Sequence, residues 1–354
     1  TTAAATRAAA DDARRLEFEL VVSRRVETAE RLFELMIRAP RLTPRGALDL
    51  LLRGPPPSTA VRCVGNASPP VRHDVFQSVR NELLERYLQR TPTAVRAIDF
   101  LNDRSLRCFN DHVALRSFVD SRGGSGADYL AGAFLAFGYS REASLAIPGL
   151  PVNAFWLEPP GETDWPKVFI SELRSSELSL EVREVVYRHV DNCYKPLNWH
   201  SLTAEDMVRA LDDVPWSITF AEERQLRSLG LGAAGEYAAW TLTHGSQWNH
   251  ATLLANAMDG PPTLQALNAA LVESGILLNS AGGDDGFTQG SVTSSLEQSS
   301  TLADAIEHEF ACGTTHAVPG AFLELISRHG GFSAFLGSNA RGIFDSTNVR
   351  NASK

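Results

Sequence analysis

The chain has 354 residues, of which 44% are apolar and 21% are charged, and its formal net charge is −9 at pH 7. This balance is typical of a folded globular protein and excludes an intrinsically disordered chain. The negative charge gives no general attraction to phosphate backbones or anionic lipid, and no stretch approaches the ~18 apolar residues that span a bilayer. We therefore expect no nucleic-acid partner and no membrane segment, and a small-molecule ligand is favoured.

The cysteines and the first residues bear on the compartment. Cys63, Cys108, Cys193 and Cys312 lie far apart without a CxxC pair, which argues against a disulfide framework and a thiolate zinc site and favours a reducing compartment. Residues 1–14 lack a starting Met and are rich in Ala, Thr and Arg. They are expected to be disordered or to be the remnant of a trimmed organelle targeting peptide, and an N-terminus cut for expression remains an alternative.

The first hundred residues are predicted to be mainly helical. Residues 11–39 space their apolar positions by three and four, as amphipathic helices do, before the run RGPPPST at 53–59 breaks the chain. A second helical stretch covers about 73–102, and Pro92 is suited to restart a helix at its first turn. We assign 15–105 as a helical region.

The pattern changes at 111–119, where apolar and polar residues alternate as in a strand. A helix at about 127–137 follows, then short apolar runs that predict strands at 144–147, 152–158 and 167–173, and a helical block at 177–245 with breaks at Pro196 and Pro215. Strand patterns return at 249–254, 302–312 and 315–328, the last two separated by Gly313-Thr314 as in a hairpin. The chain is therefore predicted to be α+β, with a β-core from 106–176 and 246–347 and a helical insertion between them. No internal repeat is visible in the sequence.

Two motifs suggest a nucleotide site and a metal site, but the sequence around each motif argues against that function. Gly230, Gly232 and Gly235 match the dinucleotide fingerprint GxGxxG, but the residues before them predict a helix where that fingerprint needs a strand, so they indicate a turn between helices. His244 and His250 are six residues apart, which matches neither a helical metal pair nor a zinc finger. His244 is a second-tier candidate, because a histidine near a helix end usually caps or packs.

Two strand patterns carry polar groups that need an explanation. Alternation in DHVALR puts His112 and Arg116 on one strand face beside the small Ala114, which suits a ligand site but also an edge strand with a solvated face. In GAFLELISR, Glu324 has apolar neighbours on both faces of its strand. Burying this carboxylate costs several kcal/mol unless it meets a cation or a metal, and a buried salt bridge with Arg328 is the alternative.

Five segments in order resemble the 2-oxoadipate dioxygenase/decarboxylase family, also called the D-2-hydroxyglutarate synthase family. They are DHVALRSF at 111–118, WNHATL at 248–253, LEQSSTLAD at 296–304, VPGAFLELISR at 318–328 and FLGSNARGIFDST at 335–347. The resemblance implies a single domain over 15–354 with a vicinal oxygen chelate-like half-open β-barrel around a metal, carrying large helical N-terminal and inserted segments. Within the family, the chain is more similar to the plant and algal branch. This implies a plastid location, with the cytoplasm as the alternative.

The same resemblance implies the site and its chemistry. The family's metal ligands fall on His112, His250 and Glu324, its substrate-binding arginine falls on Arg116, and a further substrate contact falls on or near Ser338; His112 and His250 also border the substrate. Two imidazoles and one carboxylate suit iron(II) and leave positions for a chelating 2-oxo acid and O2. The implied reaction converts 2-oxoadipate, or a related 2-oxo dicarboxylic acid, with O2 to 2-hydroxyglutarate and CO2, as in lysine breakdown. A zinc- or nickel-dependent lyase or isomerase, and a non-catalytic plastid binding protein on the same fold, remain alternatives.

Overall fold

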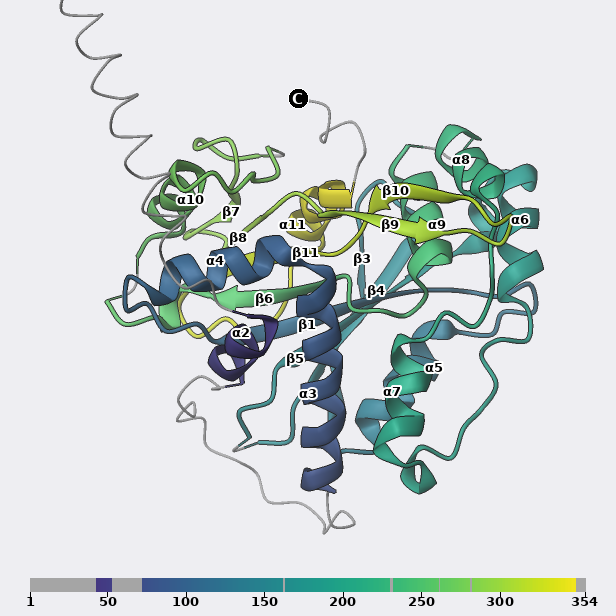
Figure 1. Ribbon diagram of the computed structural model, residues 1–354, viewed down its shortest axis with the longest axis horizontal. Helices are drawn as coiled ribbons and strands as arrows, with labels where there is room; N and C mark the ends of the chain where they lie inside the picture. Colours follow the sequence, from purple (N-terminus) through teal and green to yellow (C-terminus); the bar gives the residue numbers. More distant parts are fainter. Residues whose placement is uncertain are drawn as a thin grey trace, which may run out of the picture. The chain divides into compact units, whose positions relative to one another are not determined.

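The computed structural model describes residues 43–52, 72–161, 163–229, 232–260, 262–280 and 282–347. The helices predicted within 11–39 and the break at 53–59 lie outside these residues. Within them the chain is a mixed α/β protein built on one open sheet, drawn in Figure 1. None of its described helices combines the length and the apolar character needed to cross a bilayer.

The main sheet has nine strands among the described residues, in the order β2-β4-β5-β1-β6-β11-β8-β7, with β3 beside β4. The strands are β1 (Asn110–Phe118), β2 (Ser140–Arg141), β3 (Leu145–Ala146), β4 (Val152–Glu158), β5 (Lys167–Leu173), β6 (His250–Leu254), β7 (Gln289–Ser291), β8 (Leu296–Ser300) and β11 (Phe322–Arg328). The strands predicted at 111–119, 144–147, 152–158, 167–173 and 249–254 are thereby confirmed, two of them residue for residue.

The strand order contains a structural repeat that is not visible in the sequence. β1 pairs in parallel with β5, and β5 is antiparallel to β4. In the same way β6 pairs in parallel with β11, and β11 is antiparallel to β8. The two halves meet where β1 and β6 pair antiparallel, with Ala114 opposite His250 and His112 opposite Thr252. This pairing places a local two-fold axis at Val113 and Ala251, which relates the two halves of the sheet.

The helices cover both faces of the sheet. They are α2 (Pro44–Leu51), α3 (His73–Arg90), α4 (Pro92–Asn102), α5 (Gly126–Leu135), α6 (Leu180–Val190), α7 (Ala204–Asp212), α8 (Phe220–Leu229), α9 (Ala233–His244), α10 (Leu264–Glu273) and α11 (Gly337–Ile343), with 3₁₀ turns η1 (Ser175–Glu177), η2 (Trp199–Ser201), η3 (Ala255–Ala257) and η4 (Phe344–Thr347). Pro92 begins α4 as its position predicted, directly after α3. In Figure 1, α3 and α4 cross in front of the sheet.

Alternation along the strands divides the buried side chains into two cores. Val113 and Leu115 of β1 face a core that also contains residues of α2, α3, α4, α5, α7 and α10. Ala114 and Phe118 face a second core that contains residues of α6 and α9. His112 and Arg116, which alternate with Val113 and Leu115, therefore point to the second side. The pattern read from DHVALR in the sequence sets which side carries the polar groups.

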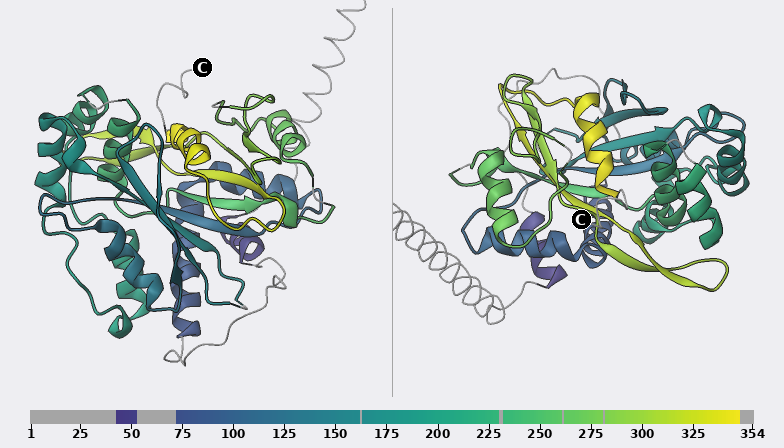
Figure 2. Two further views of the ribbon diagram at one scale, coloured as in Figure 1. Left: turned by 180° about the vertical axis from the view of Figure 1, so that it is seen from behind. Right: turned by 90° about the horizontal axis from the view of Figure 1, so that it is seen from above.

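The segment predicted as one strand at 315–328 is two strands in two sheets. β9 (Ala305–Glu309) and β10 (Thr315–Pro319) form a separate antiparallel hairpin, with Gly313 in its tip as predicted. The chain then leaves β10 at Pro319, which has no N–H to donate, and the Gly320 carbonyl accepts a hydrogen bond from Trp240 of α9. The strand β11 begins only at Phe322. Figure 2 shows this hairpin projecting away from the main sheet.

Two glycine turns flank α9, the last helix before the chain returns to the sheet at β6. Gly232, with φ of +56°, precedes α9, and the element before it is helix α8, so the glycine pattern at 230–235 lacks the strand that a dinucleotide site needs. Gly245 ends α9 with φ of +64°, in the left-handed region that glycine tolerates. The chain reaches His250 five residues later.

Tyr87 provides a test of the contact between α3 and the sheet. This buried side chain donates a hydrogen bond from its hydroxyl to the carbonyl of Phe322 at 2.6 Å, at the start of β11. Tyr87→Phe should lower the free energy of unfolding by about 1 kcal/mol in urea denaturation, because it removes one buried hydrogen bond. Tyr129→Phe is the control, since that hydroxyl has no hydrogen bond within the described residues. Equal stability of the wild type and the Tyr87 variant would contradict the role of this contact.

Candidate metal centre

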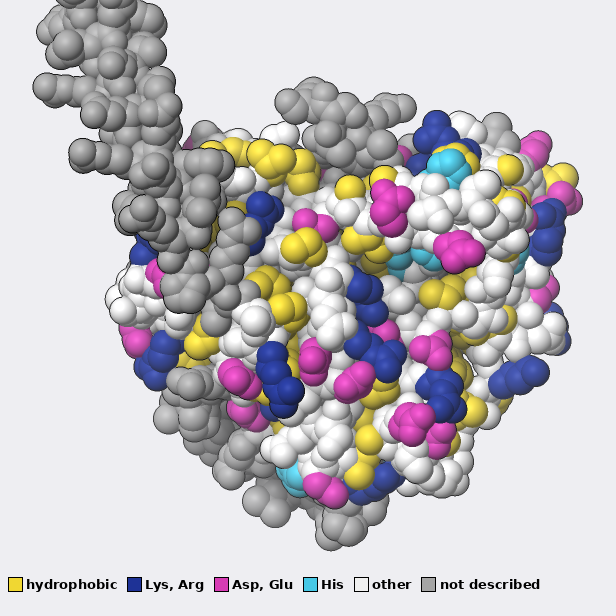
Figure 3. All heavy atoms as spheres, viewed as in Figure 1, with side chains coloured by type: hydrophobic (Ala, Val, Ile, Leu, Met, Phe, Trp, Pro, Cys, Tyr) yellow, Lys and Arg dark blue, Asp and Glu magenta, His cyan; other side chains and the backbone are white. Residues whose placement is uncertain are grey.

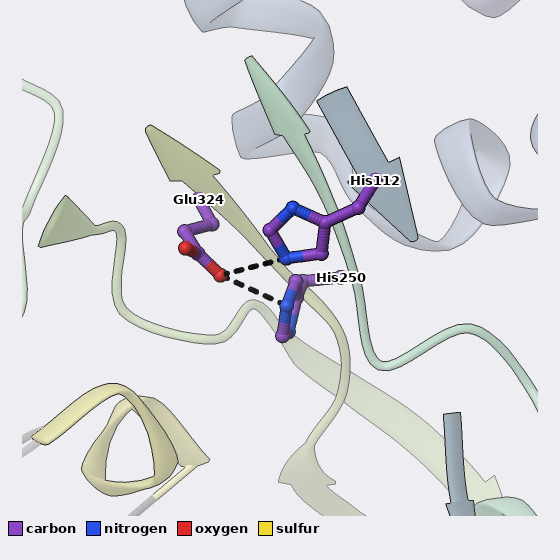
Figure 4. A group of neighbouring side chains, drawn as sticks. All are labelled: His112, His250 and Glu324. Atoms are coloured by element: carbon purple, nitrogen blue, oxygen red, sulfur yellow. Dashed lines mark ion pairs between the residues drawn. The ribbon is translucent and has the colours of Figure 1, made fainter. Parts of the chain in front are cut away.

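His112, His250 and Glu324 converge although 138 and 74 residues separate them along the chain. Their ligand atoms all lie within 4.8 Å of one another, and the three residues are 2%, 4% and 1% exposed. Nε2 of His250 is 2.9 Å and Nε2 of His112 is 3.6 Å from Oε2 of Glu324. Figure 4 shows the three side chains pointing toward one shared point. No second group of this kind occurs among the residues that the structure describes.

The sheet registers produce this convergence. β1, β6 and β11 are adjacent central strands, so the alternative of an edge strand with a solvated face is wrong for β1. Thr252 of β6 lies opposite His112 on one side and opposite Glu324 on the other. Side chains at directly paired positions of neighbouring strands stand on the same face, about 5 Å apart. The three donors therefore gather on one face around the middle of the sheet.

The electrostatics of the three groups depend on one another. Burial raises the pKa of Glu324, but the two imidazoles more than offset this and lower it to about 2. Burial lowers the pKa of His250, with further lowering by the charges of His112 and Arg116. Burial also lowers the pKa of His112, but Glu324 and Asp111 reverse this and leave its pKa above the ordinary value. The Glu324 carboxylate is thus ionised at the point where it faces the two imidazoles.

The donor set fits a divalent metal. Two imidazole nitrogens and one carboxylate oxygen on one face of an ion form the facial triad of non-haem iron(II) sites. Bonds of about 2.1 Å at right angles place adjacent donors about 3.0 Å apart, and Oε2 of Glu324 is 2.9 Å and 3.6 Å from the two imidazole nitrogens. All three ligand atoms lie within 4.8 Å of one another, so the side chains are placed to converge on one ion.

Arg328 does not pair with Glu324, so that alternative for the buried carboxylate is wrong. Its guanidinium instead binds both oxygens of Asp111, at 2.8 Å each, and Oδ2 of Asp111 is also 2.8 Å from Nδ1 of His112. Burial raises the pKa of Asp111, but Arg328 and His112 outweigh it and hold that pKa well below the usual range. Glu324 is left free to face the two imidazoles.

Further polar groups surround the three donors. The side-chain amide of Gln298 in β8 donates to Oε1 of Glu324 at 2.6 Å, which leaves Oε2 directed at the imidazoles. The hydroxyl of Thr252 is 3.1 Å from Nε2 of His112, and Oδ1 of Asn249 is 3.2 Å from Nδ1 of His250. Both histidine Nδ1 atoms thus have oxygen partners. This leaves both Nε2 atoms on the side of the carboxylate.

Arg116 is a buried charge without a carboxylate partner among the described residues. It is 2% exposed, and its one hydrogen bond there is from Nη1 to the Thr347 hydroxyl at 3.4 Å, while Nε and Nη2 have none. Aromatic rings surround the guanidinium at about 5 Å, from Tyr237, Trp240 and Phe344. Burial lowers the pKa of Arg116 to about 10, so it remains protonated at neutral pH. A buried guanidinium with free donors is suited to bind an anionic ligand.

The other two candidates lie elsewhere. Ser338 is an exposed residue in the first turn of α11, where its hydroxyl is 3.5 Å from Oδ1 of Asn339, and its substrate contact stays a prediction. His244 ends α9 and makes a hydrogen bond with the Pro319 carbonyl, outside the three-donor group. Burial lowers the pKa of His244 to about 3, so this histidine is a neutral packing residue.

Sequence reasoning missed the partners of the three donors. Asp111 precedes His112, and strand alternation would direct it to the opposite face. The register between β1 and β6 shifts between Asn110 and His112, and this irregularity accompanies the approach of Asp111 to the His112 ring. Strand alternation could have identified Arg328 as a residue of the site, because it lies four residues after Glu324 on the same strand face. Gln298 and the aromatic rings around Arg116 give no comparable signal.

Comparison with known proteins gives one family. The family model described as 2-oxoadipate dioxygenase/decarboxylase matches residues 66–334. The chloroplastic 2-oxoadipate dioxygenase/decarboxylase of Arabidopsis thaliana is 31% identical over 277 residues, which cover 75% of this chain and 71% of the relative. The chloroplastic/amyloplastic protein of that description in Oryza sativa subsp. japonica is 29% identical over 297 residues, covering 80% and 76%.

Solved structures share the fold. The hydroxyglutarate synthase from Oryza sativa, determined in complex with 2-oxoadipate, matches with a TM-score of 0.70 at 25% identity, covering 84% of this chain and 99% of that chain. A putative glyoxalase superfamily protein from Ralstonia eutropha JMP134 matches with a TM-score of 0.62 at 21% identity, covering 83% and 95%.

The open sheet with its central three-donor group defines the class: a mixed α/β protein with a buried candidate metal centre, whose fold is shared by the putative glyoxalase superfamily protein. Within this class, the chain belongs to the 2-oxoadipate dioxygenase/decarboxylase family, whose model matches most of its length. The predicted fold class, family and enzyme class are confirmed. Both plant relatives are named as plastid proteins, which confirms the predicted plastid location.

His250→Ala tests the metal centre. Removing one of the three candidate donors should weaken iron(II) binding by more than about a hundredfold, since changes to the partners of metal ligands already cost 10–100-fold. His244→Ala, which removes an equally buried histidine outside the group, should keep its iron. Both are measured by anaerobic iron(II) loading and metal analysis, with circular dichroism to verify folding. A folded His250→Ala protein with full iron content would exclude His250 as a ligand.

Proposed function

We propose that this protein is an iron(II)-dependent dioxygenase that converts 2-oxoadipate and O2 to 2-hydroxyglutarate and CO2. The observation that carries the proposal is the buried group of His112, His250 and Glu324 on the same strand faces as the uncompensated cation Arg116. The family of the chain and the 2-oxoadipate bound to the rice hydroxyglutarate synthase support this substrate.

Iron(II) is the proposed metal because the donor set is two imidazoles and one carboxylate, with no thiolate in the group. When bound, the metal would supply a site where a 2-oxo acid chelates beside O2. The protein holds the three donors in advance: Gln298 orients the Glu324 carboxylate, and Asp111 and Asn249 occupy the Nδ1 atoms of the two histidines. Such preorganised partners strengthen the binding of a metal.

Arg116 would bind a carboxylate of the substrate. It lies four residues after His112 on β1, on the same face, and its charge is close enough to lower the pKa of His250. A guanidinium with free Nε and Nη2 donors can hold a carboxylate through two parallel hydrogen bonds. The anion would neutralise the one buried arginine on this face that lacks a carboxylate partner among the described residues. Arg116 thereby fixes the orientation of the substrate.

The proposed reaction needs no other co-reactant. The bond between C1 and C2 of 2-oxoadipate breaks and C1 leaves as CO2, while C2 becomes a carboxyl group and C3 gains a hydroxyl group. Each of these carbons takes one oxygen atom from O2, and the substrate itself supplies all the electrons that reduce O2. Apolar side chains limit water near the metal ligands, as where the ring of Phe335 packs against His112 at 4.8 Å between centroids.

Turnover provides the direct test. Anaerobic protein loaded with iron(II) and given 2-oxoadipate and labelled ¹⁸O2 should release CO2 and 2-hydroxyglutarate in equal amounts. The product should carry one labelled oxygen in its hydroxyl group and one in the new carboxyl group, as mass spectrometry would detect. His250→Ala is the control and should be inactive.

The outcomes of this assay separate the alternatives. A zinc- or nickel-dependent lyase or isomerase would act without consuming O2 and would incorporate no label. A non-catalytic binding protein would bind 2-oxoadipate and release neither product. Either result from iron-loaded, folded protein would overturn the proposed reaction.

Arg116→Lys tests the binding of a substrate carboxylate. Lysine keeps the charge but lacks the planar fork, so kcat/KM for 2-oxoadipate should fall by roughly tenfold or more, the effect of losing a charged hydrogen bond of about 1.5–3 kcal/mol. Iron content should stay at the wild-type level, because a protonated guanidinium cannot coordinate a metal.

The controls assign the carboxylate that Arg116 binds. A monocarboxylic 2-oxo acid of similar length should be a poor substrate for the wild type, and should lose little more in the variant, if Arg116 binds the distal carboxylate. If it binds the C1 carboxylate, both substrates should lose activity alike. Arg90→Lys, which alters an arginine paired with Asp212, should leave kcat/KM unchanged. Wild-type kinetics of Arg116→Lys would remove Arg116 from the site.

A further inference from the structure

Asp111 and Arg328 form a buried ion pair that touches the candidate metal centre from outside. Both Asp111 oxygens accept from the Arg328 guanidinium at 2.8 Å, and the two side chains are 4% and 9% exposed. A pair of this kind is costly to bury, and replacing such pairs by apolar residues is often neutral or stabilising. Stability alone therefore does not account for it.

The pair acts directly on a proposed ligand. Oδ2 of Asp111 is 2.8 Å from Nδ1 of His112. Both Asp111 oxygens already accept from Arg328, so Nδ1 of His112 is the donor to Oδ2. In the neutral ring the lone pair then lies on Nε2, which is 3.6 Å from Oε2 of Glu324 and 3.1 Å from the Thr252 hydroxyl. Arg328 fixes the position of Asp111 through two bonds, since a bidentate pair constrains orientation as well as distance.

Arg328 also connects the ligand to the segment that follows β11. Its Nη1 donates to the carbonyl of Ala334 at 2.7 Å, and its guanidinium lies 4.8 Å from the ring centroid of Phe335. The Phe335 ring in turn makes an edge contact with His112, with 4.8 Å between ring centroids. Asp111 thus bonds Nδ1 of the His112 ring, and Phe335 packs against the same ring. Arg328 contacts both Asp111 and Phe335.

The geometry points to Asp111 and Arg328 as positioning residues that set the tautomer and the ring orientation of His112 for metal binding. The inference rests on the proposed metal site of His112, His250 and Glu324. Neither residue belongs to the group of three donors that would hold the metal. Their effect is on the affinity and the coordination geometry of the ion that His112 binds.

Cobalt(II) is the probe, because its visible absorption spectrum reports coordination geometry without turnover. Asp111→Asn should weaken cobalt binding by roughly 10–100-fold, the range seen when carboxylate partners of metal-bound histidines are removed. Competition with a coloured chelator measures this affinity. The cobalt absorption bands of the variant should also shift. Arg328→Lys keeps the charge but loses the bidentate contact, and a smaller weakening of the same sign is expected.

Asp212→Asn is the matched control. Asp212 is an equally buried aspartate bound by two nitrogens of Arg90, but it lies in α7, whose apolar residues belong to the core on the other side of the sheet. Its substitution should lower the melting temperature while cobalt affinity and spectrum stay as in the wild type. The double variant Asp111→Asn/Arg328→Gln leaves no unpaired buried charge, so it separates metal binding from folding if Asp111→Asn alone is too unstable.

The results distinguish this inference from the proposed function. A wild type that binds no divalent metal overturns the metal site and the positioning role with it. A wild type that binds cobalt, together with folded Asp111 variants that bind it within about twofold and with an unchanged spectrum, overturns only the role of the ion pair. Weakened binding in the Asp111 and Arg328 variants, with normal binding in Asp212→Asn, supports it.

Discussion

The antiparallel register between β1 and β6 is the constraint on which the candidate site depends. It places Ala114 opposite His250 and His112 opposite Thr252, so both histidines stand on one face near the local two-fold axis. A slip by one residue would reverse the face of every side chain on one strand and separate the two imidazoles. The apolar residues at alternate positions, such as Val113 and Ala251, are buried in the core on the other side and oppose such a slip.

On the strand face that carries the candidate site, the pairing of charges shows which side chain is left to bind an anionic substrate. Asp111 and Arg328 neutralise one another, and Glu324 faces two imidazoles that would share a metal with it. Arg116 has only aromatic rings and one long hydrogen bond among the described residues, which do not compensate a buried charge. The face drawn in Figure 3 shows positive and negative side chains mixed together. Because Arg116 is only 2% exposed, its uncompensated charge belongs to the interior of the site and not to this face.

Much of the site could be predicted, because its residues lie in strands whose alternation is visible in the sequence. DHVALR and FLELISR each show which side chains share a face, and the resemblance to the family joined them with His250 into one group. Asp111 escaped prediction since a register shift brings it near its neighbour in the chain, and no local pattern marks such a shift. The end of β10 was missed for a similar reason: the alternation continues through Pro319 and Gly320, but the missing N–H of proline and the contact of Gly320 with Trp240 divide it into two strands.

The two-fold relation between the halves of the sheet explains why the site is one-sided. The rotation that exchanges β1 and β6 carries His112 onto His250, and the pairings with β5 and β11 then carry Phe169 onto Glu324. A symmetric sheet would offer four inward positions around a metal, but in this chain one of them is an aromatic ring that packs against Phe335. With Phe169 at the fourth position, the three candidate donors lie on one side and an aromatic ring lies on the other. Arg116 occupies a position that corresponds to Leu254 in the second half, so the half that lacks the carboxylate ligand supplies the cation. The differences between the two halves thus place the carboxylate of the candidate metal centre in one half and the cation suited to an anionic substrate in the other.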